Sequence, residues 1–366
     1  MSPLLAVLPE LEKVAECVVI GRKYTFEHDL AESLEYKTLL SQGTPFFDLK
    51  AARLQRKLTR HTLPSFIKFP KSFLSAKRIL KKEKPDVVLT FGGYIALPVC
   101  IAARALHIPI VLHEQTQRAG LTNKLIGIIA NKVCISYSTS KIYFPKNKTV
   151  LTGNPLRLEV LKVQDKIEIS TNKPILTIMG GSSGSHRINL YVKEILEKLL
   201  TTYNVIHQTG DAQEFKDYDM LSGFKEGLSP ELQKGYVIRK FILPNEIGWV
   251  YKHTDVFVCR AGANTVSELL ALSKKALLIP LPFSQMDEQL ENAKYYKSSG
   301  LGDYVLEKDI DSEKLYTVIH EVFSKKTQAQ DKAQDTHSSA EQIVQVVKDA
   351  VSYEKTKDSI KLPQES

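Results

Sequence analysis

Short apolar runs alternate with longer amphipathic stretches along most of this chain. In the first half the runs occupy 86–92, 109–115, 132–137 and 148–153, and intervening stretches such as "LTNKLIGIIA" place apolar residues at helical spacing. In the second half "PILTIMG", "NVIHQTG", "YVIRKFI", "DVFVCRAG", "ALLIPLP" and "DYVLEKD" continue the alternation. Nearly all-apolar strands between helices are typical of parallel sheets that are covered on both faces. The pattern therefore predicts an α/β protein.

The alternation lapses once, and this lapse divides the chain into two domains. Periodicity is lost and charge rises over 154–173, where we expect an interdomain linker. Residues 1–153 and 174–326 would then each form a doubly wound parallel-sheet domain, with a cleft between them that binds ligands at the carboxyl ends of the strands. A polar stretch, one more amphipathic helix and a charged tail make up 327–366.

The first element breaks the usual order. Leucines recur at helical spacing from Pro3 to Ala15, which predicts a helix, and Cys17–Gly21 is predicted to be a short strand after it. Almost every later helix follows a strand and a glycine-bearing turn, but this one has neither before it.

Positive charge is concentrated in one segment. The formal net charge is +9, and eleven Lys or Arg with no Asp or Glu lie from Lys50 to Lys82, so the rest of the chain is slightly acidic. Phe and Leu residues are interleaved with these charges, a composition that suits an anionic bilayer surface. We therefore expect segment 50–82 to contact an anionic membrane surface, and a solvated helix face is the alternative. Nucleic-acid binding is not expected, because no nucleic-acid motif accompanies the charge.

The remaining composition is that of an ordinary globular protein in a reducing cytoplasm. Hydrophobic residues make up 43% and charged residues 25% of the chain. The first apolar run lacks the basic flank of a signal peptide, and the most apolar stretch, 92–113, contains Arg104 and His107. The four cysteines lack CxxC spacing, which favours buried thiols over a disulfide or a metal site.

Three loops that follow predicted strands of the second domain carry candidate chemistry. "MGGSSGSHRIN" places glycines and serines before a helix, which suits a phosphate at the helix N-terminus, with an ordinary tight turn as the alternative. "CRAGANTVSEL" repeats the device. There Glu268 is placed to hold ribose hydroxyls, but helix capping by Asn264 or Thr265 explains the same residues equally well. "PLPFSQMDEQLENA" has a polar cluster suited to sugar hydroxyls or simply to a helix start.

Two strand ends of the first domain also carry polar residues. "FGGYIALP" supplies Tyr94, and "VLHEQTQRAGLTN" supplies His113 and Glu114. Two acidic motifs, 309–311 and 217–219, resemble metal-binding sequences. The first directly precedes a predicted helix and more simply caps it, and the second is predicted to lie in a polar loop. We expect no metal site at either.

Taken together, these motifs resemble those of one family. "FGGYIALP", "HEQTQRAGLTN", "TGNPLR", "MGGSSGSHRIN", "HQTG", "CRAGANTVSEL" and "DEQLENA" occur in the order of the MurG family of glycosyltransferase family 28, over about residues 3–325. The resemblance implies a GT-B fold, with an acceptor domain facing the membrane, a donor domain and a final helix that returns to the first domain. It implies a peripheral enzyme on the cytoplasmic face of the cell membrane that needs no cofactor. The implied substrates are UDP-N-acetylglucosamine and a polyprenyl-diphosphate-linked muramyl peptide.

The resemblance also implies roles for individual residues. Arg157 and Ser182 would contact the diphosphate. Ile242 would bind uracil through its backbone, Glu268 would hold the ribose and Gln289 would contact the sugar. Further donor-site positions are Thr116, Ala263, Asn264, Thr265, Val266 and Ser267, and further cleft positions are Tyr94, Asn123, Gly181, Gly184, Asn189, Arg260 and Glu288.

Two side chains and the chain start depart from the family pattern. Thr116 stands where the family usually has Asn, and Glu288 stands where some relatives have Gln. The family's first strand and its "GGTGGH"-like loop, which carries the histidine often proposed as base, have no counterpart here. We expect a start codon assigned too far downstream. Without that strand, Cys17–Gly21 and a neighbouring strand should lack hydrogen-bond partners. A chain as given should therefore fold poorly and be nearly inactive, since each unmet buried backbone group costs ~1–3 kcal/mol.

The implied reaction is an inverting displacement at the anomeric carbon. Arg157, the amides of 181–184 and the helix dipole would stabilise the departing diphosphate without a tightly bound metal. His113 and Glu114 are the remaining candidates for the general base. The competing interpretations are another GT-B lipid glycosyltransferase, a UDP-sugar epimerase and a non-catalytic UDP-sugar-binding subunit.

Overall fold

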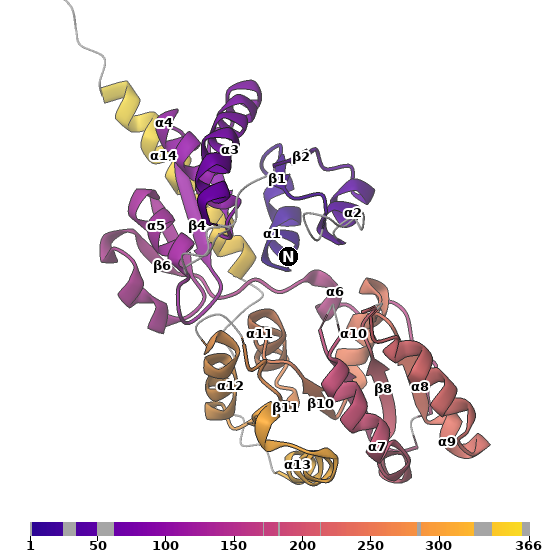
Figure 1. Ribbon diagram of the computed structural model, residues 1–366. Coiled ribbons are helices and arrows are strands. Elements are labelled where there is room, and N and C mark those ends of the chain that lie inside the picture. The colour runs from indigo at the N-terminus through magenta and orange to yellow at the C-terminus, as the bar shows by residue number, and fades with distance from the viewer. Residues whose placement is uncertain are drawn as a thin grey trace, which may run out of the picture. The chain divides into compact units, whose positions relative to one another are not determined.

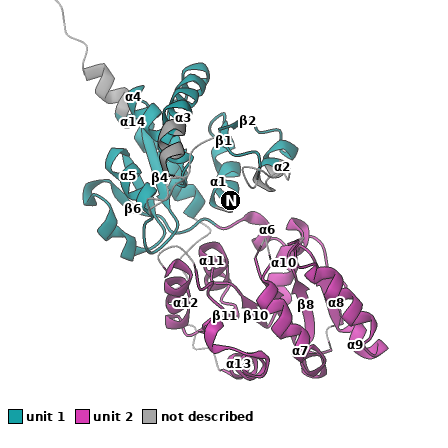
Figure 2. Cartoon of the chain, viewed as in Figure 1, with its two compact units in different colours: residues 1–155, 337–366 teal, residues 156–336 magenta. Residues whose placement is uncertain are grey.

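The computed structural model divides the chain into two compact units (Figures 1 and 2). Unit 1 comprises residues 1–155 and 337–366, and unit 2 comprises residues 156–336. The structure describes residues 2–24, 34–49, 62–170, 172–181, 184–212, 214–283, 287–325 and 339–360.

The main sheet of unit 1 has four parallel strands in the order β3-β4-β5-β6. Its strands are β3 (Val88–Thr90), β4 (Ile110–Glu114), β5 (Lys132–Ile135) and β6 (Thr149–Leu151). All four lie within the apolar runs predicted as strands. Because side chains alternate along a strand, Ile110 and Leu112 of β4 pack with helices on one face, whereas Val111 packs on the other. The sheet is therefore covered on both sides, as the apolar pattern predicts.

The helices of unit 1 supply these two covering layers. Residues of α3, α4 and α5 form one core cluster with Ile110 and Leu112, and residues of α14 form the other with Val111. The helical elements of unit 1 are α1 (Ser2–Glu12), α2 (Leu34–Ser41), α3 (Thr62–Glu83), α4 (Ala96–Ala105), α5 (Leu121–Ile129), η1 (Ser138–Tyr143), η2 (Lys146–Lys148) and α14 (Ser339–Ile360).

A separate two-stranded sheet follows α1. The predicted strand at Cys17–Gly21 is present as β1 (Val19–Gly21), and it pairs in parallel with β2 (Phe46–Asp48), which the sequence pattern did not predict. Leu8 of α1 and Leu39 of α2 bury the apolar side of this sheet in their own small cluster. The strand therefore has a partner on one side, contrary to the expectation of none, while β1 and β3 lie in two separate sheets of the described chain.

Unit 2 contains one six-stranded parallel sheet in the order β12-β11-β10-β7-β8-β9. The chain starts at β7 in the middle, builds outward to β9, and returns to build β10 to β12 on the other side. Strand order thus reverses between β7 and β10, which is the position where doubly wound sheets bind ligands. The strands are β7 (Ile175–Met179), β8 (Asn204–Gln208), β9 (Tyr236–Arg239), β10 (Val256–Cys259), β11 (Lys275–Leu278) and β12 (Asp303–Tyr304).

Helices cover both faces of this second sheet as well. Leu176 and Ile178 of β7 pack with residues of α7 and α13, whereas Ile175 and Met179 pack with residues of α10, α11 and α12. The helical elements of unit 2 are α6 (Leu158–Leu161), α7 (His186–Thr202), α8 (Asp217–Glu226), α9 (Pro230–Lys234), α10 (Pro244–His253), α11 (Ala263–Ala271), α12 (Glu288–Ser298), η4 (Glu307–Asp309) and α13 (Ser312–Ser324).

The segment 154–173, expected to be a linker, contributes to the core of unit 2. It contains α6, and Val160, Ile167 and Ile169 are buried in the cluster that α10 and α11 also form. The segment was predicted to be a linker because its apolar residues lack a regular period and its charge is high. Buried apolar residues nevertheless anchor it to unit 2.

Candidate functional site

Two loops leave the sheet of unit 2 side by side where the strand order reverses. Met179 at the end of β7 lies opposite Cys259 at the end of β10. The glycine loop from Gly180 leads from β7 into α7, and the loop from Arg260 to Gly262 leads from β10 into α11. The two motifs that the sequence singled out are therefore brought to one edge of the sheet.

Backbone conformation explains the glycines of the first loop. Gly181 and Gly184 have φ values of +89° and +77°, which side chains rarely adopt. A Cβ on Gly184 would also lie 2.0 Å from the carbonyl oxygen of Thr209. The 17-residue helix α7 follows, and its first turn offers free N–H groups of the kind that bind phosphate. Ser182, the predicted diphosphate contact, lies outside the described residues.

The second loop differs from the capping prediction. Gly262 is the N-cap of α11, and neither Asn264 nor Thr265 caps the helix. Both side chains are half-buried in its first turn. The remaining predicted donor residues of this helix, Ala263, Val266, Ser267 and Glu268, are buried.

Glu268 lies at the centre of a hydrogen-bonded triad that the sequence did not predict. Arg157 donates to Oε1 of Glu268 from Nε at 3.0 Å and from Nη2 at 2.8 Å. The hydroxyl of Tyr251 donates to Oε2 at 2.7 Å. The Arg157 side chain is 31% exposed and that of Glu268 is 5% exposed. Arg157, predicted to contact the diphosphate, and Glu268, predicted to hold the ribose, are therefore hydrogen-bonded to each other.

The titration of this triad follows from its burial and charge. Burial opposes the charge on Arg157, but the Glu268 carboxylate outweighs it and raises the pKa of the guanidinium. Burial, with a smaller contribution from the same carboxylate, raises the pKa of Tyr251 well above its usual value. Tyr251 therefore remains a hydrogen-bond donor at any physiological pH.

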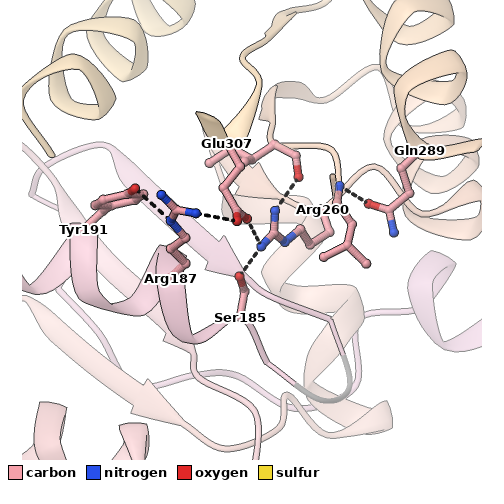
Figure 3. Close-up of polar contacts among 8 residues, drawn as sticks. Ser185, Arg187, Tyr191, Arg260, Gln289 and Glu307 are labelled. Carbon is pink, nitrogen blue, oxygen red and sulfur yellow. Dashed lines mark hydrogen bonds and ion pairs between the residues drawn. The ribbon is translucent and has the colours of Figure 1, made fainter. Parts of the chain in front are cut away.

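A second Arg–Glu pair lies at the same edge of the sheet (Figure 3). Arg260 pairs through Nη2 with Glu307, and both side chains are largely buried, at 11% and 8% exposed. Arg260 also donates to Oγ of Ser185 at 2.6 Å and to the carbonyl of Ile279 at 3.1 Å. These bonds connect the glycine loop, the end of β11 and η4. Arg260, predicted as a cleft residue, is thus held by internal partners.

Gln289 and Glu288 begin helix α12. Gln289 accepts a hydrogen bond from the backbone N–H of Leu281 at 2.9 Å, which ties the helix start to the loop after β11 (Figure 3). Glu288 is half-buried at the first position of the helix.

Gln208 is hydrogen-bonded to two residues that were predicted to lie at the nucleotide, Gly181 and Ile242. Its Nε2 donates to the carbonyl of Gly181 at 3.0 Å, and its Oε1 accepts from the backbone N–H of Ile242 at 3.4 Å. Ile242 itself is partly buried against the unit 2 core. The "HQTG" motif carried the signal for Gln208, although the sequence assigned it no role.

Asn189, also predicted as a cleft residue, is fully buried beneath the glycine loop. It donates to the carbonyl of Thr209 and to Asp217, and its Oδ1 lies 3.0 Å from His207 Nε2. Asp217 in turn lies 2.6 Å from Nδ1 of His186, at the start of α7. The Asp217 motif is therefore part of a helix, not of a polar loop. Asn189 holds the loop after β8 against α7.

Unit 1 brings together a second set of predicted residues. Glu114, at the end of β4, is 2% exposed. Its Oε1 accepts hydrogen bonds from the backbone N–H and the hydroxyl of Thr116 at 2.9 and 2.7 Å, and its Oε2 accepts from Asn123 at 2.8 Å. Burial raises the pKa of Glu114, although these bonds oppose the shift. The hydroxyl of Thr116, a predicted donor-site residue, therefore already binds Glu114.

His113 and Tyr94 complete this set. His113 is fully buried, its Nε2 lies 3.0 Å from the carbonyl of Gly153, and burial lowers its pKa to about 4. Tyr94 follows β3, and its hydroxyl accepts a hydrogen bond from Arg22 at 2.9 Å. Gly92, with φ +82°, leaves the space that Asn123 occupies, since a Cβ there would lie 2.0 Å from its Oδ1.

Metal ligands are not clustered in the described part of the chain. No three His, Cys, Asp or Glu side chains there are arranged to hold a metal ion. Sequence analysis missed Tyr251 and Glu307, which lie outside any motif with a known mechanism, whereas Ser185 belongs to the predicted glycine and serine loop. Their contacts join elements far apart in the sequence.

Comparison with known families identifies relatives along nearly the whole chain. Residues 1–135 match the glycosyltransferase family 28 N-terminal domain, and residues 175–349 match the glycosyltransferase family 28 C-terminal domain. A protein of Clostridium novyi (strain NT) is 34% identical over 337 residues, 89% of this chain and 88% of the relative. A protein of Lachnospira eligens is 32% identical over 335 residues, 90% of this chain and 89% of the relative. Both are named UDP-N-acetylglucosamine--N-acetylmuramyl-(pentapeptide) pyrophosphoryl-undecaprenol N-acetylglucosamine transferase.

Solved structures show the same fold. A MurG crystal structure from Acinetobacter baumannii matches with a TM-score of 0.68 and 24% identity, covering 95% of each chain. A putative UDP-N-acetylglucosamine 2-epimerase from Listeria monocytogenes matches with a TM-score of 0.63 and 14% identity, covering 96% of this chain and 92% of the other. The predicted α/β fold with two doubly wound, Rossmann-like domains of GT-B type is confirmed, and so is the family resemblance.

Proposed function

Because the chain belongs to glycosyltransferase family 28, we propose that it transfers N-acetylglucosamine from UDP-N-acetylglucosamine to a polyprenyl-diphosphate-linked muramyl peptide. The product is the disaccharide lipid used in peptidoglycan synthesis, and the acceptor is the muramyl 4-hydroxyl. The observation that carries this proposal is the 34% identity to the Clostridium novyi transferase, which extends over 89% of this chain.

The donor contacts of the proposal lie at the reversal of strand order in unit 2. Arg157 contacts the diphosphate with the amides of 181–184, Ser182 included, at the start of α7. The backbone of Ile242 binds uracil, Glu268 holds the ribose and Gln289 contacts the sugar. What supports these roles is that Arg157, Glu268 and the glycine loop all come from loops and helices around β7 and β10. Residues 263–267, in the first turn of α11, supply further contacts with the donor.

The reaction is an inverting displacement. The muramyl oxygen attacks the anomeric carbon from the face opposite the diphosphate, the bond to the diphosphate oxygen breaks, and UDP leaves with the electron pair. Arg157 and the backbone amides stabilise the charge that develops on the diphosphate. The proton of the muramyl hydroxyl passes to a base of unit 1.

Of the two base candidates, Glu114 has the better-suited proton affinity. Burial lowers the pKa of His113 to about 4, so its charged form is disfavoured at neutral pH. Burial moves the pKa of Glu114 the other way, toward the operating pH, where a general base works best. We assign proton acceptance to Glu114, and an orienting role to Thr116 and Asn123, which bind its two oxygens.

Membrane contact through segment 50–82 is the second part of the proposal. Residues 50–61 lie outside the described residues, but α3 presents Lys71, Leu74, Arg78 and Lys81 as exposed side chains on one helical face. Phe69 and Phe73 instead pack against the unit 1 core, contrary to the expectation of exposed aromatics. No described helix is long and apolar enough to span a bilayer. The proposal is a peripheral position on the cytoplasmic membrane face, and what supports it is the exposed basic and apolar face of α3.

The transfer assay tests the reaction. Purified protein is incubated with labelled UDP-N-acetylglucosamine and a short-chain analogue of the lipid acceptor, with the Clostridium novyi relative as positive control. The expectation of a nearly inactive chain predicts neither product. Because β1 is paired with β2, we instead expect a labelled disaccharide lipid and UDP in equal amounts. Release of an epimerised UDP-sugar without transfer, or UDP-sugar binding without turnover while the relative is active, would overturn the proposal.

The membrane contact is tested separately by sedimentation with vesicles. Replacement of both Lys71 and Arg78 by Glu should weaken binding to phosphatidylglycerol-containing vesicles strongly, since each juxtamembrane charge contributes ~1 kcal/mol. Lys252→Glu, an exposed change on α10 of unit 2, should leave binding unchanged. Equal binding of all three proteins would reject α3 as the contact.

A further inference from the structure

Glu268 has fewer free acceptor positions than a ribose requires. A carboxylate offers about four lone-pair positions, two on each oxygen. Two donors of Arg157 fill Oε1, and Tyr251 occupies half of Oε2. A ribose brings two adjacent hydroxyl groups. The observed geometry therefore accommodates one of them and not both.

One of the two partners must leave if both hydroxyls are to bind. Tyr251 is 1% exposed, belongs to the apolar core and packs against Phe257 with 5.0 Å between ring centroids. Arg157 is the N-cap residue of the short helix α6, and its side chain is 31% exposed. Arg157 can therefore swing away into solvent, whereas Tyr251 cannot move without disrupting the core.

We propose that a ribose hydroxyl replaces Arg157 on Oε1 of Glu268 when a uridine diphosphate sugar binds, and that Tyr251 is the positioning residue that holds Glu268 in place during this exchange. The inference rests on the proposed function, which assigns the diphosphate to Arg157 and the ribose to Glu268. The released guanidinium turns to the diphosphate, which carries more negative charge than one carboxylate and accepts bidentate hydrogen bonds.

The exchange couples recognition of the two halves of the nucleotide. To bind Glu268 through both hydroxyls, uridine must displace Arg157, and it offers the guanidinium no new anion. Uridine diphosphate also brings a diphosphate, so Arg157 regains an anionic partner while the ribose hydroxyls bind Glu268. The pair thus disfavours ligands that have a ribose but no diphosphate. Removal of Arg157 should relieve this penalty for uridine while it weakens binding of the diphosphate.

The decisive experiment is a competition titration of wild type and Arg157→Ala with three ligands: UDP, uridine and 2′,3′-dideoxyuridine. We expect Arg157→Ala to bind UDP at least about tenfold more weakly and uridine about fivefold more tightly, as loss of a competing charged hydrogen bond predicts. Affinity for dideoxyuridine, which cannot use Glu268, should not change. Thermal unfolding checks that the variant is folded. Unchanged or weaker uridine binding by the folded variant would overturn the exchange.

Tyr251→Phe tests the positioning role with a change that keeps the ring. We expect its KM for UDP-N-acetylglucosamine to rise about tenfold with kcat within about twofold, because Glu268 loses one fixed donor. The affinity loss should be absent for dideoxyuridine. The matched control is Tyr203→Phe, another buried tyrosine of unit 2, whose hydroxyl faces His320. If Tyr251→Phe weakens all ligands equally, or Tyr203→Phe has the same effect, the role is merely structural.

These results separate the inference from the proposed function. Failure of wild type to bind UDP would reject the donor site itself. Binding of UDP by wild type, together with no gain of uridine affinity in Arg157→Ala, would reject only the exchange.

Discussion

Glu114 in unit 1 and Glu268 in unit 2 are two buried carboxylates with different hydrogen-bond partners. They are 2% and 4% exposed, and each accepts hydrogen bonds on both carboxylate oxygens. All donors to Glu114 are neutral. Glu268 is bound by the guanidinium of Arg157 and by one hydroxyl.

The difference in partners predicts a difference in chemistry. Neutral donors only partly offset the cost of burying a charge, so the pKa of Glu114 is raised and the carboxylate is ready to take a proton. A cation balances the charge of Glu268, and because that cation is partly exposed it can be exchanged for a ligand. Although the two carboxylates are similarly buried, neutral donors suit Glu114 to proton transfer, and an exchangeable cation suits Glu268 to ligand binding.

The sharpest test removes the negative charge from Glu114. We expect Glu114→Gln to lower kcat about 10²–10⁴-fold, the usual contribution of a general base, with little change in the KM of the donor. The same change at the exposed Glu341 on α14 of unit 1 serves as the control. A loss below tenfold would leave Glu114 as a structural residue.

Acid should weaken the fold through the buried histidines of both units. Burial lowers the pKa of His113 to about 4 and that of His207 to about 3. Below pH 6.5 the unfolded chain binds protons that these buried rings do not, so stability falls with decreasing pH. For His113 alone the loss between pH 7.5 and pH 4.5 is about 2.5 kcal/mol.

Urea unfolding across this pH range measures the effect. The pH-dependent difference between wild type and His113→Gln isolates unit 1, and His207→Gln isolates unit 2. If neither variant reduces the dependence on pH, the two rings are not buried in the neutral form.

Replacement of Glu268 should affect binding and spare the chemical step. We expect Glu268→Gln to raise the KM for UDP-N-acetylglucosamine roughly 10–100-fold, since hydrogen bonds to charged groups are strong, while kcat changes little. Steady-state kinetics beside Glu114→Gln gives the comparison directly. Two variants with the same split between kcat and KM would remove the distinction between these carboxylates.

The smallest effect concerns one neutral donor to Glu114. Thr116→Val removes a hydroxyl that stabilises the charged form, so the pKa of Glu114 should rise further and kcat should fall about two- to fivefold at neutral pH. The acid limb of the kcat profile should move to higher pH. Thr116→Ser, which keeps the hydroxyl, is the control, and a limb shifted to lower pH would contradict the assignment.

Most of the scaffold could be predicted from the sequence, because its signals are local. Apolar runs located the strands of both main sheets, and the glycines of 180–184 marked a loop whose positive φ values the structure confirms. Strand β2 was missed, since three residues at Phe46–Asp48 give too short a pattern. The capping prediction at Asn264 or Thr265 was wrong, because Gly262 begins α11 and tertiary contacts hold the helix.

The candidate site was predicted only as a set of residues. Arg157 was predicted to contact the diphosphate and Glu268 to hold the ribose. The structure shows that these two side chains, 111 positions apart, are hydrogen-bonded to each other. The sequence assigned nothing to Tyr251 or Glu307. No periodicity or motif encodes such pairs, since they depend on how α10, α11 and η4 pack around the sheet.

By itself, the sequence determined the order of strands and helices, the family and the loops that carry chemistry, because side-chain periodicity and glycine-rich turns act over a few neighbouring residues. Tertiary structure alone decided which donors surround each buried carboxylate. Burial magnifies the effect of every nearby charge, so the choice between a cation and neutral donors, made by packing, sets what Glu114 and Glu268 can do.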